Sequence, residues 1–161
     1  MAMIVEKALG MLGDAAYAGR TADILDVEWY NTGKRVDRKA TRGGKDVGIR
    51  MDHATSHTGF TQDQVVYDDG TNLIAINILP CPCIRIKVSG GAALVKLCYE
   101  IGNRHAPFFY GEGEGEFLTP EDGPILALVR GLGAEAETVE AKLLPERSIS
   151  SVRGHSHGHS H

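Results

Sequence analysis

The alternation of apolar and polar positions predicts β-strands through the first half of the chain. Val47, Ile49 and Met51 fall on one side of segment 46–51, with polar residues or glycine between them. A period of two is typical of a strand with one buried face. The apolar segments on either side of Asp69-Gly70 predict a hairpin across a tight turn. The predicted strands are 24–30, 36–40, 46–51, 64–67 and 73–78, and 52–61 is expected to be a polar loop without a helix.

A change of pattern at residues 80–82 indicates a junction between two domains. This segment reads Pro-Cys-Pro, and proline has no backbone N–H to donate to a sheet. The segment 83–88 alternates strictly and predicts a strand. The apolar residues that follow recur at helical spacing. They predict a helix over 92–102 that buries Leu94, Leu97, Cys98 and Ile101.

The remainder of the second half predicts a second helix and three more strands. Thr119-Pro120-Glu121 has the features of a helix start, namely a capping hydroxyl, a proline in the first turn and an acid. The apolar residues between Ile125 and Leu132 continue at helical spacing. Strands are expected at 108–110, 115–118 and 138–144. The resulting order, β-α-β-β-α-β, is the ferredoxin-like arrangement.

These patterns predict an α+β protein in three parts. Residues 1–79 are expected to form an all-β domain, and residues 80–148 a ferredoxin-like domain. Residues 149–161 are rich in Ser, Gly and His and predict a flexible tail.

Composition excludes several classes of protein. The 161 residues are 42% hydrophobic and 24% charged, in the range of a soluble globular protein. A net charge of −4 argues against nucleic acid as the main partner, because phosphate binding needs a concentrated basic surface. No apolar run is long enough for a membrane span, and the first residues do not resemble a secretory signal. Three cysteines are an odd number and predict free thiols, so we expect a cytoplasmic protein.

Four histidines near the end of the chain form a candidate metal-binding segment. Imidazole suits Ni²⁺, Cu²⁺, Zn²⁺ and Co²⁺, so the segment indicates a class of ions and not one ion. A purification tag is the alternative, although here Ser and Gly alternate with the histidines. The candidate ligands are His155, His157, His159 and His161.

Other candidate residues are more ambiguous taken singly. His105 follows the first predicted helix, and one imidazole is a poor metal site unless a two-fold dimer brings a second copy to it. Cys81 and Cys83 could be a soft-metal or redox pair, or simply thiols at a domain junction. His53 and His57 are expected to be solvated. The chain has no P-loop and no recognisable nucleophile–base arrangement, so we do not expect an enzyme.

Several segments carry a resemblance to a known family. The segment 96–105, Lys-Leu-Cys-Tyr-Glu-Ile-Gly-Asn-Arg-His, resembles the signature of the urease accessory protein E family, the nickel metallochaperones of urease maturation. The segments 25–29, 44–50, 73–77 and 153–157 also resemble that family.

The resemblance implies a fold, an assembly and a set of ligands. It implies an N-terminal domain similar to the peptide-binding domain of Hsp40 chaperones, followed by the ferredoxin-like domain. It further implies a homodimer through the C-terminal domains, with His105 of both chains at a shared nickel site that tail residues, first His155 and His157, complete. The implied partners are the urease accessory GTPase and apo-urease.

The sequence therefore predicts a cytoplasmic Ni²⁺ chaperone that is not an enzyme. Some members of the family have an extra histidine pair after the motif, where this chain has Phe117, Thr119 and Glu121, so delivery of one or a few ions is favoured over storage. Neutral imidazole is the ligand, and protonation near pH 6 is expected to weaken binding. The alternatives are a peptide-binding co-chaperone and a metal buffer without a transfer partner.

Overall fold

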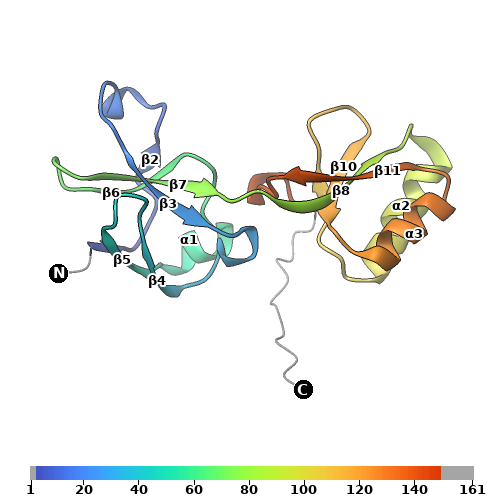
Figure 1. The fold of residues 1–161 in the computed structure, drawn as a ribbon, viewed down its shortest axis with the longest axis horizontal. Helices are drawn as coiled ribbons and strands as arrows, with labels where there is room; N and C mark the ends of the chain where they lie inside the picture. The colour runs from blue at the N-terminus through green and yellow to red at the C-terminus, as the bar shows by residue number, and fades with distance from the viewer. Residues whose placement is uncertain (1–2, 150–161) are drawn as a thin grey trace, which may run out of the picture. The chain divides into compact units, whose positions relative to one another are not determined.

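The computed structural model describes residues 3–149, which form a mixed α+β protein. The chain divides into two compact units. The first contains residues up to Leu79 together with Leu144–Glu146, and the second contains Pro80–Leu143 together with the residues from Arg147 on. Each unit has its own apolar core. Figure 1 shows the helices and strands of both units as a ribbon.

The first unit contains two small sheets around one core. One sheet has the strand order β1-β5-β4, and the other has the order β2-β6-β7-β3. Most strand pairs are antiparallel, but β1 pairs with β5, and β3 with β7, in parallel. The strands are β1 (Met3–Val5), β2 (Gly10–Met11), β3 (Asp23–Val27), β4 (Val36–Ala40), β5 (Asp46–Arg50), β6 (Gln64–Asp68) and β7 (Leu73–Ile78).

The predicted strand patterns in this unit are confirmed where the periodicity is strong. Val47, Ile49 and Met51 are all buried in the core, as expected for one face of β5 and its continuation. The hairpin across Asp69-Gly70 is also present, because β6 pairs antiparallel with β7. Strands β1 and β2 were not predicted, since segments of two or three residues are too short to show a period.

The prediction of a loop without helix at 52–61 is wrong. A short helix, α1, spans His53–Thr58. It begins because Asp52 caps it, its carboxylate accepting a hydrogen bond of 2.7 Å from the backbone N–H of Thr55. Only Thr55 of the six residues is buried. A helix this short with one inward residue leaves no helical period in the sequence.

The second unit has one four-stranded sheet with the order β11-β8-β10-β9, all pairs antiparallel. The elements follow the chain as β-α-β-β-α-β. Both helices pack on one face of the sheet, where Leu97 and Ile101 of α2 and Ile125 and Val129 of α3 share a core with Ile84 of β8 (Figure 1). The elements are β8 (Cys81–Lys87), α2 (Gly91–Asn103), β9 (Phe109–Tyr110), β10 (Glu116–Pro120), α3 (Gly123–Gly131) and β11 (Glu135–Ala141), and a 3₁₀ turn at Pro145–Arg147 follows them.

The predicted start of the second helix at Thr119 is wrong. Thr119 and Pro120 end strand β10, and the buried Thr119 hydroxyl donates to the carbonyl of Pro107 at 2.8 Å. The helix begins at Gly123 instead, because the Asp122 carboxylate accepts from the N–H of Ile125 at 2.9 Å. Pairing of β10 with β8 therefore outweighs the local helix signal. The last strand also lies three residues earlier than expected at its start, at Glu135 and not Thr138.

The expectation that Cys98 is a core residue is also wrong, because its side chain is exposed. Leu97 and Ile101 point into the core, and Leu94 is half-buried. At about 100° per residue, Cys98 lies on the flank of this stripe and not at its centre.

No helix in residues 3–149 combines the length and the apolar composition that crossing a bilayer requires.

Candidate metal centre

His105 lies in the turn that ends helix α2. Its φ of 52° places it in the left-handed region, which is unusual for a residue other than glycine. Its N–H donates to the carbonyl of Gly102 at 3.0 Å, and the N–H of Ala106 donates to the carbonyl of Ile101 at 3.3 Å. These two bonds form a Schellman motif, which satisfies carbonyls that a helix end leaves unpaired. Ile101 is buried in the core and Ala106 packs against the same core, so both ends of the turn are anchored there.

The surroundings of His105 favour a cation. The carboxyl end of a helix carries the negative end of its dipole, which favours a positive charge by about 0.3–1 kcal/mol. The neighbouring cation, Arg104, is already paired: its Nη1 donates to Oε2 of Glu100 at 2.8 Å and to the Glu100 carbonyl at 3.1 Å. His105 itself is exposed. The imidazole is therefore held on the surface by the backbone and is accessible to an ion.

One chain does not complete a metal site from its described residues. No group of three or more His, Cys, Asp or Glu side chains in residues 3–149 is arranged to hold a metal ion. His53 and His57 are exposed on α1 of the other unit. The four predicted tail ligands, His155, His157, His159 and His161, lie outside the described residues.

The last described residues lie beside the segment that follows His105. The N–H of Ile149 donates to the carbonyl of Phe108 at 2.9 Å. Ser148 forms an antiparallel bridge with Phe109, on the outer strand β9. The tail histidines therefore follow a point that is hydrogen-bonded three residues from His105. No sequence pattern predicted this contact, because pairing between distant segments leaves no local pattern.

Helix α2 has a second apolar face that the sequence analysis did not identify. Val95 and Tyr99 are 70% and 66% exposed. They lie about 160° and 200° around the helix axis from Leu97, which is on the opposite, buried side. An apolar helix face exposed to water is typical of an interaction surface. The apolar residues on both sides of this helix are visible in the sequence, and a helix that is apolar on two sides is usually covered on both.

Cys81 and Cys83 lie close together on strand β8. Their sulfur atoms are 3.6 Å apart. Burial raises the pKa of the Cys83 thiol to about 12, and it also raises the pKa of Cys81. Both side chains are therefore neutral thiols at physiological pH. They belong to the sheet, whereas His105 follows a helix.

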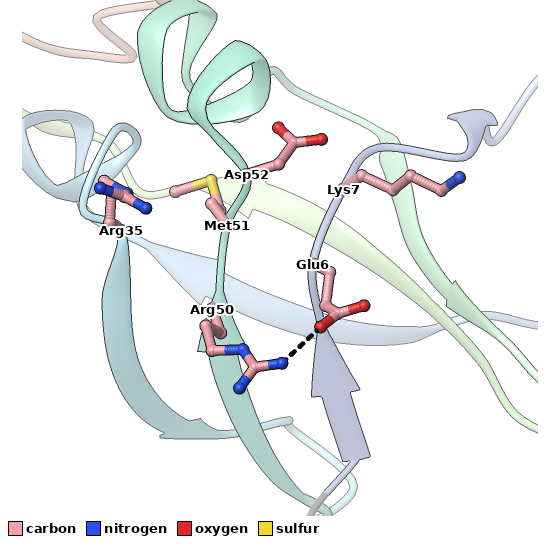
Figure 2. Close-up of a pocket in the computed structure, with 6 residues that line it drawn as sticks. All are labelled: Glu6, Lys7, Arg35, Arg50, Met51 and Asp52. Carbon is pink, nitrogen blue, oxygen red and sulfur yellow. Dashed lines mark hydrogen bonds and ion pairs between the residues drawn. The ribbon is translucent and has the colours of Figure 1, made fainter.

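A cavity of about 430 Å³ on the first unit has a charged lining (Figure 2). Within it, a guanidinium nitrogen of Arg50 lies 3.0 Å from Oε1 of Glu6. The lining contains no His or Cys, and Met51 is its single apolar member, so it suits neither nickel nor an apolar peptide. The lining residues are Glu6, Lys7, Arg35, Arg50, Met51 and Asp52.

Comparison with known proteins identifies the family. The family description "UreE urease accessory protein, C-terminal domain" matches residues 81–161. The urease accessory protein UreE of Helicobacter pylori (strain G27) is 38% identical over 154 residues, which cover 96% of this chain and 90% of that protein. The chain belongs to the UreE family. The UreE proteins of Helicobacter acinonychis (strain Sheeba) and Helicobacter bizzozeronii are 40% and 31% identical, over 88% and 95% of this chain and 82% and 86% of theirs.

Membership of the UreE family confirms the resemblance drawn from the segment 96–105. The matched range 81–161 includes His105 and all four tail histidines. The relatives also align with the first unit, since they cover nearly the whole chain.

The left-handed backbone at His105 predicts an unusual order of stability among its variants. An L-residue with a side chain pays roughly 1–2 kcal/mol in this conformation, and glycine pays much less. We expect His105→Gly to be more stable than His105→Ala by about 1 kcal/mol, although both lack the imidazole. Urea unfolding followed by circular dichroism measures this difference.

Arg104 is the matched control, because its φ of −88° suits any L-residue. At that position, glycine is expected to be less stable than alanine. The same order of stability at both positions would contradict the assigned turn geometry.

Proposed function

We propose that this chain is a nickel carrier of the urease maturation machinery that works as a homodimer. One observation carries the proposal: the N–H of Ile149 donates to the carbonyl of Phe108, three residues after the exposed His105. His155 follows Ile149 by six residues, and an extended segment of that length spans at most about 20 Å. This length would allow the imidazole of His155 to reach the exposed imidazole of His105. Membership of a family of urease accessory proteins supports the same role.

The proposed nickel site draws donors from three places. Ni²⁺ in biological sites takes four to six donors, and imidazole is among the ligands that suit it. Residues 3–149 of one chain offer His105 without two further donors beside it. A second copy of the chain would supply a second His105, and the tails would supply His155 and His157. In this arrangement the tail ligands can leave one at a time, so the ion can be released to a partner.

The exposed apolar face of α2 is the proposed dimer surface. Val95 and Tyr99 lie on the helix that leads into the His105 turn. A two-fold axis that runs nearly along α2 would pair this face with its copy and also place the two His105 turns near each other. The dimer is thus proposed to form through the second unit, whose β-α-β-β-α-β order and sheet order support a ferredoxin-like domain. The first unit is proposed to resemble the Hsp40 peptide-binding domain.

The proposed partners are the urease accessory GTPase and apo-urease, in the cytoplasm. The role is delivery and not catalysis. Cu²⁺, Zn²⁺ and Co²⁺ are expected to bind the same imidazoles in vitro, because the donors alone do not select nickel.

Replacing His105 tests the shared site. His105→Ala removes two ligands from each dimer, so the tightest Ni²⁺ site is expected to weaken by at least about tenfold, or 1.4 kcal/mol. The dimer is expected to persist. Calorimetric titration with Ni²⁺ and light scattering measure the two properties. His53→Ala, an exposed histidine on α1, is the control and should bind Ni²⁺ as the unaltered protein does. An unchanged tight site in His105→Ala would rule out the shared-site proposal.

A charge on the second face of α2 tests the dimer surface. Tyr99→Asp is expected to give a monomer at micromolar concentrations, because a carboxylate would have to be buried against its own copy. The tight nickel site is expected to weaken along with the dimer. Tyr30→Asp is the matched control, since Tyr30 is 62% exposed on the first unit, and it should remain dimeric. Light scattering after size exclusion measures the mass of each variant in solution. A dimeric Tyr99→Asp would place the interface elsewhere.

Deleting residues 155–161 tests the contribution of the tail. Affinity for Ni²⁺ is expected to fall without disappearing, because water can replace the lost nitrogen donors. The number of ions bound should also fall, while the unfolding midpoint stays the same. Replacing His155 and His157 together should reproduce most of the loss, and replacing His159 and His161 should cause less. If deletion changes neither affinity nor stoichiometry, the tail has no part in binding.

A further inference from the structure

The Cys-Pro-Cys segment that begins β8 has no part in the proposed nickel site, yet it places two sulfur atoms side by side. Cys81 and Cys83 project from the same face of the strand, because they are two residues apart. Their sulfurs lie 3.6 Å from each other. We infer that these two residues form a second metal site, which binds the soft monovalent ion Cu⁺ through two thiolate sulfurs.

The spacing suits a bridging metal better than a disulfide. Residues two apart in a strand have Cα atoms about 6.6 Å apart, near the upper limit for a disulfide, and their parallel Cβ bonds are held too far apart for one. A sulfur–sulfur bond of about 2.05 Å would require the start of β8 to bend. By contrast, two sulfurs bound at about 2.3 Å to one metal ion lie about 3.8 Å apart at a tetrahedral angle and about 4.6 Å apart in a linear two-coordinate arrangement. Rotation of the partly exposed Cys81 side chain can supply the increase from 3.6 Å that a two-coordinate ion needs.

The small number of donors selects the kind of ion. Cys83 is fully buried, and its thiol has polar contacts with the other sulfur and with the carbonyl oxygens of Cys81, at 3.3 Å, and Ala141, at 3.7 Å. No third His, Cys, Asp or Glu in the described part of the chain joins the pair. Zn²⁺ normally needs four ligands. Cu⁺ is soft, prefers thiolates and is stable with two of them, so it fits a site with two sulfurs and no more.

The binding step balances without any change of oxidation state. Two thiols give up their protons, two Cu–S bonds form, and copper stays at +1, so the complex carries a net charge of −1. Cys81 is partly exposed and meets the ion first; the buried Cys83 then completes the pair.

A competition titration tests the inference on the full-length protein. Cu⁺ is added without oxygen in the presence of bathocuproine disulfonate, a chelator strong enough to remove Cu⁺ from imidazole. The unaltered protein is expected to retain one ion per chain. Cys81→Ser is expected to lose about 100-fold or more in affinity, because the second donor of a tethered pair acts at a high effective concentration. Cys83→Val, which fills the buried space, should behave in the same way.

Controls separate this site from the other thiol and from nickel. Cys98→Ser removes the exposed thiol of α2 and should retain Cu⁺ fully. Cys81→Ser should bind Ni²⁺ as the unaltered protein does, so failure of one site does not imply failure of the other. X-ray absorption at the copper edge should show two sulfur neighbours. Equal Cu⁺ retention by Cys81→Ser, equal loss in Cys98→Ser, or nitrogen neighbours at the copper would overturn the inference.

Discussion

The position of His105 depends on how helix α2 ends. The left-handed conformation of His105 allows two hydrogen bonds to the last carbonyls of the helix. The N–H of His105 donates to the carbonyl of Gly102, and the N–H of Ala106 donates to the carbonyl of Ile101. Ile101 is buried, so this turn is anchored in the core. The imidazole is exposed, but the backbone that carries it is as fixed as the helix. In the proposed nickel site, a side chain on such a backbone would need little ordering on binding an ion, which favours binding.

Sequence patterns predicted the elements that are long enough to repeat a regular buried face. Strand β5 and helix α2 are examples. The family motif in segment 96–105 indicated His105 as a candidate metal-binding residue. The patterns failed where a distant segment decides the outcome. Thr119 has the local features of a helix cap, yet pairing with β8 holds it in a strand. The hydrogen bond between Ile149 and Phe108 joins residues 41 apart and leaves no local pattern in the sequence.

Helix α2 has two apolar faces, and only one of them packs on the sheet of its own unit. Leu97 and Ile101 attach it to the sheet, and Val95 and Tyr99 remain for another surface. The residues proposed as ligands in the second unit lie at the margins of its elements: His105 after the helix, and Cys81 and Cys83 at the start of a strand.

The hydrogen bonds of Ser148 and Ile149 have a consequence for solubility. The outer strand β9 would otherwise present free N–H and C=O groups next to Phe108 and Phe109, and exposed strand edges of this kind promote aggregation. Ser148 and Ile149 occupy part of this edge. The opposite edge, β11, is protected differently, by Glu135, Glu137 and Glu140. A chain that stopped before Ser148 would therefore lose more than its histidines, because the edge of its sheet could then pair with the sheet edges of other molecules.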